Sequence, residues 1–227
     1  MNVVKRLLNK TNYIFTDASL IKKAGIGIYY QTATIQIPIQ IPIQKYYYID
    51  GKKDINRAEL AAIYAGLLLY PRVQMEKPSP LEKPTPLEKP TPLEHIDIFS
   101  DSMTAINLIE DRTYNAKFDI LVQCIRYLSS KKYSNTNIIY TKVKAHSGIK
   151  ENDIAHYLAR CGARSGVARS DTDRTGDANP QIFHIPDAQV LNSKSNSKTK
   201  ISNATIEELV LDNIYKNSLL HSDIYFS

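Results

Sequence analysis

The sequence contains no tryptophan, few cysteines and no long apolar segment. Its two cysteines, Cys124 and Cys161, stand in segments expected to be helical and lack both CxxC spacing and neighbouring histidine pairs. A zinc site or a disulfide framework is therefore not expected. No apolar run reaches the ~18 residues that a membrane span needs, and residues 1–10 are polar and basic. We therefore expect an intracellular protein with neither a signal peptide nor a membrane anchor.

The charge of the chain is moderately positive and unevenly distributed. The 29 lysines and arginines outnumber the 23 acidic residues, which gives a net charge of +6. Residues 164–227 hold seven basic and eight acidic residues, so residues 1–163 carry +7. An excess of this size favours a polyanionic partner by counterion release, although many proteins are modestly basic without binding one. The charge alone therefore supports a nucleic-acid partner only weakly.

Three strands are expected at the start of the chain. Residues 12–19 and 25–32 are rich in β-forming residues and predict an antiparallel pair with a short turn between them. A QIPI repeat follows, and its prolines are unsuited to a central strand, so we expect it to lengthen the next hairpin. The third strand is predicted at residues 44–49.

Helices and strands then alternate. Asp54 is expected to cap a buried helix over residues 54–70, which ends before a proline. The remaining pattern predicts two further strands, at 95–100 and 137–144, and three further helices, at 101–110, 117–131 and 150–163. This order predicts an α/β fold with a five-stranded mixed sheet, antiparallel through its first three strands and then parallel, flanked by helices.

Two segments fall outside this pattern. Residues 76–94 consist of three near-copies of a proline-rich hexad closed by a glutamate, which predicts an extended, solvated insertion. Residues 164–227 are polar and predict a partly disordered tail, with one helix expected at 205–220, where a T-x-x-E capping box begins. The catalytic domain is thus assigned to residues 10–163.

Three carboxylates occupy positions that ordinarily hold none. Asp17 lies near the end of an apolar strand, Glu59 on an apolar helix face, and Asp101 directly after another apolar strand. Each has an ordinary explanation alone: Asp17 opens a turn, Glu59 is solvated, and Asp101 caps the following helix. Together they predict a cluster that divalent cations must neutralise. Oxygen ligands select hard ions such as Mg²⁺, and two such ions form a known device for phosphodiester cleavage.

Four motifs in order resemble the type 1 ribonuclease H family over roughly residues 10–163. They are TDAS around Asp17, NRAEL around Glu59, FSDS around Asp101 and KAHSGIKEND around His146. The resemblance implies an RNase H-like fold and an endonuclease that hydrolyses the RNA strand of RNA–DNA hybrids, leaving a 3′-hydroxyl and a 5′-phosphate. It also implies that the three carboxylates bind two Mg²⁺ or Mn²⁺ ions and that the histidine assists proton transfer or product release.

The resemblance also implies how the hybrid is held. Ser19, Asn56 and Arg57 stand where the family meets the minor groove of the hybrid, although Arg57 could equally be a surface ion-pair partner. The basic protrusion and the N-terminal hybrid-binding domain of some members are not found. Binding of the substrate is therefore expected to be weak, or to depend on otherwise ordinary surface lysines, namely Lys22, Lys23, Lys131 and Lys132.

The sequence departs from the family at two positions. His156 stands where the family has a fourth carboxylate, as in some retroelement members, and a neutral ligand there favours Mn²⁺ over Mg²⁺. Asp153, one helical turn earlier, is the alternative fourth ligand. Asp54 replaces the hydroxyl residue with which the family holds a DNA phosphate, so we expect it to serve as a helix cap.

Two other functions compete with this one. A DNA nuclease or resolvase on the same fold would also use a carboxylate cluster, but Asn56, Arg57 and the His146 loop argue against it. A catalytically weakened or inactive nucleic-acid-binding domain is favoured by His156 and Asp54 and disfavoured by three intact carboxylates. We expect a monomer that binds an RNA–DNA hybrid and does not bind a membrane.

Overall fold

The computed structural model describes residues 12–31, 42–49, 51, 53–71, 94–134, 136–165, 181–186 and 201–218. Most of the QIPI repeat and of the proline-rich insertion lies outside these residues. The elements are β1 (Tyr13–Leu20), β2 (Ala24–Gln31), β3 (Ile43–Ile49), α2 (Ile55–Leu69), β4 (Glu94–Ser100), α3 (Met103–Ile109), η1 (Ala116–Phe118), α4 (Asp119–Lys131), β5 (Thr136–Lys142), α5 (Lys150–Ser165), β6 (Ile182–Phe183) and α6 (Asn203–Ser218).

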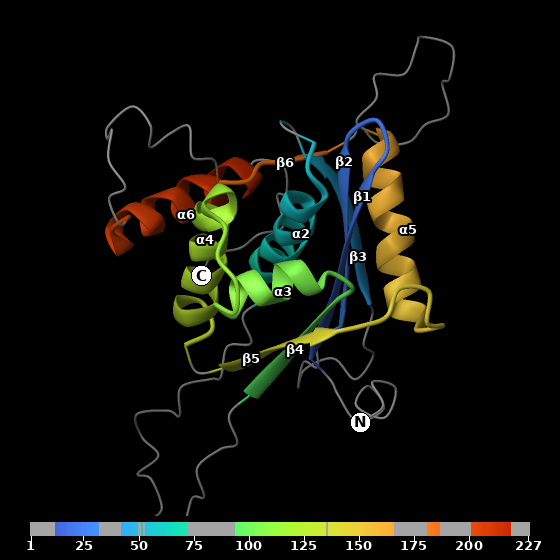
Figure 1. Cartoon of the computed structure of the whole chain (residues 1–227), viewed down its shortest axis with the longest axis horizontal. Coiled ribbons are helices and arrows are strands. Elements are labelled where there is room, and N and C mark those ends of the chain that lie inside the picture. The colour runs from blue at the N-terminus through green and yellow to red at the C-terminus, as the bar shows by residue number, and fades with distance from the viewer. Residues whose placement is uncertain are drawn as a thin grey trace, which may run out of the picture.

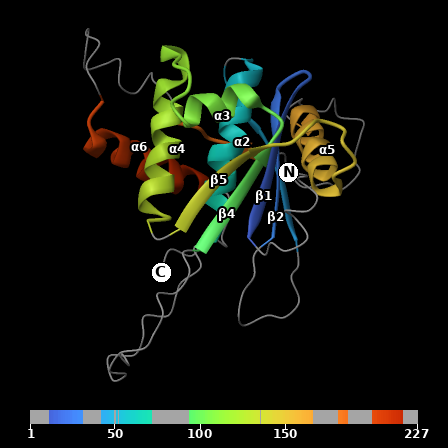
Figure 2. The same ribbon diagram turned by 60° about the horizontal axis from the view of Figure 1, so that its bottom comes forward.

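The strands form one mixed sheet in the order β5-β4-β1-β2-β3-β6. The pairs β1–β2 and β2–β3 are antiparallel, whereas β1–β4, β4–β5 and β3–β6 are parallel. Helix α5 covers one face of the sheet, and α2, α3 and α4 lie over the other (Figure 1). Figure 2 shows β5, β4, β1 and β2 side by side with these helices on either side. The predicted α/β fold with a helix-flanked mixed sheet is confirmed.

The predicted number of strands is wrong, because β6 adds a sixth strand at the edge of the sheet. The backbone N–H of Tyr48 donates to the carbonyl oxygen of Gln181 at 3.2 Å. Phe183 is 1% exposed, and its ring lies 5.4 Å from that of Tyr47 and 6.2 Å from that of Tyr64. A strand of two residues in a polar segment has too little β pattern to be recognised in the sequence.

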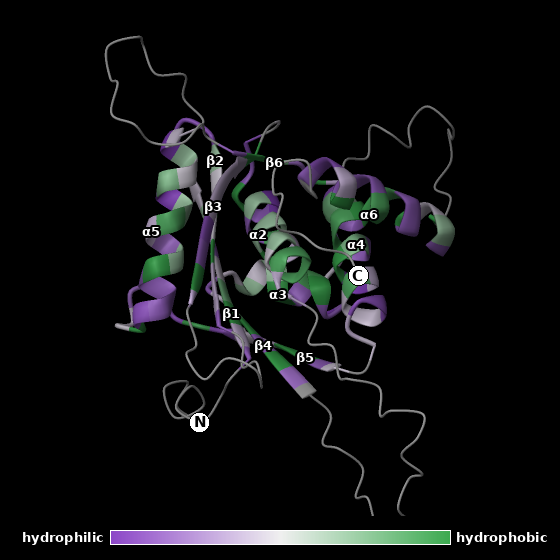
Figure 3. Cartoon of the chain, turned by 180° about the vertical axis from the view of Figure 1, so that it is seen from behind, coloured by the Kyte–Doolittle hydropathy of each residue, from purple (hydrophilic) through white to green (hydrophobic). Residues whose placement is uncertain are grey.

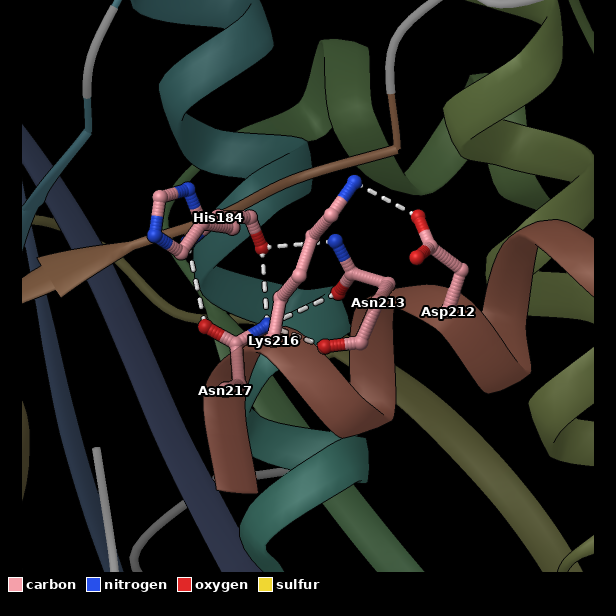
Figure 4. A network of polar contacts seen from close by, with 5 residues as sticks. All are labelled: His184, Asp212, Asn213, Lys216 and Asn217. Carbon is pink, nitrogen blue, oxygen red and sulfur yellow. Dashed lines mark hydrogen bonds and ion pairs between the residues drawn. The ribbon is translucent and has the colours of Figure 1, made fainter. Parts of the chain in front are cut away.

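The segment after β6 is held by the last helix. Where the sequence predicts a helix at 205–220, the structure has α6 at Asn203–Ser218, packed against α4. The Asn217 side chain accepts from the backbone N–H of His184 at 3.0 Å and donates to the His184 carbonyl at 2.9 Å, and Asn213 donates to the same carbonyl (Figure 4). Figure 4 also shows the ion pair between Lys216 and Asp212 beside this network. Both backbone groups of one residue are therefore fixed by α6.

The sheet is buried on both faces. In β1, Ile14 belongs to the large core beneath α2, whereas Phe15 belongs to a smaller core beneath α5. Phe15 stacks on Phe99 of β4 with the ring centroids 4.6 Å apart. Helix α2 lies between the sheet and α4 and is hydrophobic along most of its length (Figure 3). Within the described ranges, no helix combines the length and the apolar character that crossing a membrane requires.

Helix α5 lies unusually close to β2, because β2 presents glycines to it. A Cβ on Gly27 would lie 2.0 Å from the carbonyl oxygen of Ala155, and one on Gly25 would lie 2.0 Å from the backbone nitrogen of Ala163. On the helix, a Cβ on Gly162 would lie 2.2 Å from the carbonyl oxygen of Tyr47. Helix and sheet therefore meet backbone to backbone, which no residue with a side chain allows at these positions.

Helices α2 and α3 have no basic residue in their last turn, and α4 and the turn after it supply the missing cations. Arg126 donates to the carbonyl oxygens of Leu108 and Ile109 at the end of α3. The Lys132 ammonium donates at 2.8–3.0 Å to three carbonyl oxygens at the end of α2, those of Leu67, Leu68 and Tyr70. These bonds satisfy groups that helix ends leave exposed. Lys132 is thus used within the fold and not for substrate grip.

Replacing Phe183 tests whether β6 belongs to the core. We expect Phe183→Ala to lower the free energy of unfolding by about 3–5 kcal/mol, because a buried ring is lost and a cavity remains. Gln181→Ala is the matched control: it removes an exposed side chain and keeps the backbone bond to Tyr48, so it should change stability by less than about 0.5 kcal/mol. Urea denaturation measures both, and equal stabilities would contradict the packing described.

The contact between β2 and α5 leads to a second stability prediction. We expect Gly27→Ala to destabilise the protein by about 3 kcal/mol or more, at the upper end of overpacking effects, because the obstructing atoms are backbone. Ile26→Val, on the opposite face of the same strand, removes one buried methyl group and should cost about 0.5–1.5 kcal/mol. A Gly27→Ala protein as stable as the wild type in thermal and urea denaturation would refute the close approach of the two backbones.

Candidate functional site

The three carboxylates predicted from the sequence lie together at one edge of the sheet. Strands β1 and β4 are parallel neighbours, so Asp17 in β1 and Asp101 directly after β4 come to the same end. Glu59, in α2, reaches them from the helix layer. One oxygen of each carboxylate lies within 4.8 Å of the others. We call Asp17, Glu59 and Asp101 the carboxylate cluster.

Local capping interactions position two of these carboxylates. Asp54 caps α2 as predicted: its Oδ1 accepts from the backbone N–H groups of Asn56 at 2.9 Å and Arg57 at 3.2 Å. This fixes the first turn of the helix, on which Glu59 follows. At the start of α3, the cap is Ser102, whose hydroxyl accepts from the backbone N–H of Ala105. The carboxylate of Asp101 is therefore not used by the cap.

Burial and mutual repulsion disfavour the charged forms of the cluster. Burial, followed by the charge of Asp101, raises the pKa of Asp17 to about 6. Burial, followed by the charges of Asp17 and Asp101, raises the pKa of Glu59 well above its ordinary value. Glu59 Oε2 is buried and has no hydrogen-bond partner within the described part of the chain. Buried carboxylate oxygens that lack a donor fit a hard divalent cation, which supplies the missing positive charge.

Two histidines stand beside the cluster. His156 of α5 is half-buried, and its Nδ1 lies 2.6 Å from Asp17 Oδ2, so a protonated Nδ1 donates to that carboxylate. It is not a member of the group of three whose ligand atoms lie within 4.8 Å of one another. The His146 ring lies edge-on, 5.1 Å from that of His156. Asp153, the alternative fourth ligand, is exposed on α5.

His146 lies in an exposed loop with unusual backbone geometry. Its φ of 54° falls in the left-handed region, and Gly148 follows with a φ of 76°. A left-handed conformation is uncommon for a residue with a side chain. The geometry directs the loop between β5 and α5 and brings the imidazole to the edge of the cluster.

The residues expected to bind substrate occupy the same neighbourhood. Ser19 is half-buried in β1, two positions after Asp17, so its side chain points to the same face of the sheet. Asn56 and Arg57 are half-buried in the first turn of α2, within three positions of Glu59. The structure therefore brings Ser19 near the first carboxylate and the Asn-Arg pair near the second.

Sequence analysis missed Lys142 at this site. The residue ends β5 opposite Ser100, and its ammonium donates to the backbone carbonyl of Asp101. A lysine at the end of a strand looks like an ordinary solvated charge in sequence, and only the parallel pairing of β4 and β5 brings it to the cluster. Two of the suggested gripping lysines, Lys22 and Lys131, are exposed, whereas Lys23 lies over the Tyr48 ring.

Solved structures of RNase H1 proteins resemble this chain at low sequence identity. RNase H1 from Halobacterium salinarum is 14% identical, with a TM-score of 0.45 over 67% of this chain and 96% of that one. LC11-RNase H1 in complex with an RNA/DNA hybrid is 12% identical, with a TM-score of 0.45 over 66% and 96%. No curated protein sequence gave a significant match. The family described as RNase H matches residues 9–164, which is more than half of the sequence, and the chain therefore belongs to the RNase H family.

Proposed function

We propose that this chain is a metal-dependent endonuclease that hydrolyses the RNA strand of RNA–DNA hybrids, acting as a monomer through a catalytic domain at residues 10–163. The observation that carries the proposal is the buried carboxylate cluster in a member of the RNase H family. An oxygen of Glu59 without a donor, in a group of three acids, calls for a cation. No comparable need exists in a domain that merely binds nucleic acid.

The proposed metal ligands are Asp17, Glu59, Asp101 and His156. Two Mg²⁺ or Mn²⁺ ions bound there would supply an activated water for attack on the phosphodiester and positive charge for the leaving oxygen. The contribution of the protein is to hold these ligands in position. The backbone N–H of Ala18 donates to Asp17 Oδ1 at 2.9 Å, which orients that carboxylate. Strand β1 and helix α2 then hold the three carboxylates at a separation at which their negative charges repel one another unless a cation is bound.

His156 is the proposed fourth ligand in place of a carboxylate. Its 2.6 Å contact with Asp17 supports this assignment over Asp153, whose side chain is exposed. An imidazole brings a nitrogen ligand and no negative charge, so the site should hold its cations less tightly and accept Mn²⁺ more readily than a site with four carboxylates.

His146 is the proposed proton carrier. Its exposed loop position lets the imidazole exchange protons with water, and its place beside His156 keeps it close to the reacting phosphate. An imidazole is suited to this task because its unperturbed pKa is ~6.5. Protonation also gives it a positive charge with which to draw the product phosphate away.

Ser19, Asn56 and Arg57 are the proposed hybrid-binding residues. They stand on β1, which carries Asp17, and in the first turn of α2, which carries Glu59. Hydroxyl, amide and guanidinium groups match the 2′-hydroxyls and base edges of the minor groove, and the 2′-hydroxyl is what distinguishes an RNA strand from DNA. This arrangement favours hybrids over DNA duplexes.

The second candidate function is an inactive or weakened nucleic-acid-binding domain. The presence of His156 in place of a carboxylate favours it, as does Asp54, which pairs with Lys117 and would repel a phosphate. Incubating the protein with labelled RNA–DNA, RNA–RNA and DNA–DNA duplexes in Mg²⁺ or Mn²⁺ separates the candidates. Cleavage of the hybrid alone supports the proposal, cleavage of DNA identifies a DNA nuclease, and binding without cleavage in either metal identifies the binding domain.

We expect Asp17→Asn to abolish hybrid cleavage and to stabilise the metal-free protein at neutral pH. The raised pKa means that the folded state binds the Asp17 proton more tightly than the unfolded state. Stability is therefore lost as the pH rises from about 4 to about 6, by roughly 3 kcal/mol for a shift of this size. The Asp17→Asn variant should not show this loss of stability, because its side chain at this position does not titrate.

Chemical denaturation in a chelator at pH 5 and pH 7.5 measures this difference. The wild type should be more stable at pH 5, with a smaller pH effect in Asp17→Asn. The exposed Asp153→Asn serves as the control and should follow the wild type. A variant with wild-type turnover, or with an unchanged pH dependence of stability, would contradict the role given to Asp17.

We expect His156→Asp to raise Mg²⁺-supported cleavage and to reduce any advantage of Mn²⁺, because a carboxylate adds a negative charge and a harder ligand. Cleavage rates across titrations of each metal measure the change, with His156→Ala for comparison. If both His156 variants keep the wild-type metal preference while Asp153→Asn alters it, Asp153 is the fourth ligand.

A further inference from the structure

Lys142 is a positive charge placed at the rim of an acidic site. It is the last residue of β5, and its pairing with Ser100 sets it beside the residue that precedes Asp101. Its ammonium donates to the backbone carbonyl of Asp101, while the residue remains exposed to solvent. An ammonium has three N–H donors, and this bond uses one of them.

The charge of Lys142 acts on the carboxylate cluster. Its ammonium bonds to the main chain of Asp101, one of the three acids. Because like charges repel, the same ammonium must weaken the binding of divalent cations to the cluster. The Lys142 ammonium therefore weakens metal binding to the cluster. Its presence there indicates an anionic partner, which the substrate supplies.

Other cations near the helices already have partners within the fold. Lys117 pairs with the carboxylate of Asp54, and Arg126 pairs with Asp111 in addition to its bonds at the end of α3. The bonding partner of Lys142 is instead a main-chain carbonyl, which carries no net charge. This bond leaves two N–H donors and the charge of the ammonium beside Asp101.

We propose that Lys142 is a positioning residue that binds a phosphate of the nucleic-acid strand beside the carboxylate cluster. The inference rests on the proposed function only in taking a nucleic acid as the substrate. The ammonium is a compact point charge on a flexible stem, a chemistry suited to a phosphate oxygen. In the absence of substrate, the same group is a tethered counter-ion that competes with the metal ions.

The first test measures binding of a labelled RNA–DNA hybrid in a chelator, by fluorescence anisotropy over a series of salt concentrations. Lys142→Met should lower the slope of log affinity against log salt by about 0.9, the value for one lost phosphate contact. Lys142→Arg keeps the charge and should keep the slope. Lys216→Met is the matched control, with an equal change of charge at an exposed residue in the last turn of α6.

The second test measures Mg²⁺ or Mn²⁺ binding by calorimetry without nucleic acid. Lys142→Met should tighten metal binding by roughly threefold, because a repelling charge has been removed, and Lys216→Met should not. A lysine that merely stabilised the fold would move neither the salt slope nor the metal affinity in these directions. Equal salt slopes for the Lys142→Met and Lys216→Met proteins would overturn the phosphate contact, and equal metal affinities would overturn the competition with the metal ions.

The two proposals fail separately. If the wild-type protein cleaves no duplex but Lys142→Met still lowers the salt slope, the proposed hydrolysis is wrong and the phosphate contact stands. If the wild-type protein cleaves hybrids and Lys142→Met leaves both the slope and the metal affinity unchanged, the phosphate contact is wrong and the hydrolysis stands.

Discussion

The geometry of the site depends on the close approach of α5 to β2. Gly27 is paired with Asp17 across the sheet, and the carbonyl of Ala155 lies where a Gly27 side chain would be. The residue after Ala155 is His156, whose ring contacts Asp17 at 2.6 Å. Because the helix rests on bare backbone, its position has little freedom. The distance between the His156 imidazole on α5 and the Asp17 carboxylate on β1 is thus set by the absence of a side chain at Gly27 on β2.

The carboxylate cluster adds nothing to the stability of the folded chain by itself. Burial raises the pKa of both Asp17 and Glu59, which means that folding works against their charged forms. The surrounding packing, with Ile14 and Phe15 fully buried on opposite faces of β1, holds the acids in place nonetheless. A cation bound there would relieve this repulsion, so the proposed metal binding would be coupled to the stability of the domain.

The sequence predicted most of the fold and the three acids, since long elements have strong patterns and the acids stand out in apolar surroundings. What it could not predict depends on tertiary contacts. The two residues of β6 are too few to show the alternation of a strand. Their place in the sheet depends on the burial of the Phe183 side chain. Capping was the ordinary alternative explanation for Asp101, and only the structure shows that the neighbouring Ser102 caps α3. Lys142 and Lys132 looked alike as surface lysines, and only their neighbours distinguish a rim charge from a helix cap.

The bonds from Arg126 and Lys132 have a consequence for how this layer comes apart. Each joins α4, or the turn that ends it, to the terminus of another helix, α3 or α2, so separating any of these elements breaks bonds to main-chain carbonyls that water must then solvate. The three helices should therefore open as a single cooperative unit in native-state amide hydrogen exchange. Since α2 carries Glu59, motions that loosen α4 reach the acidic site through the far end of the helix that bears it.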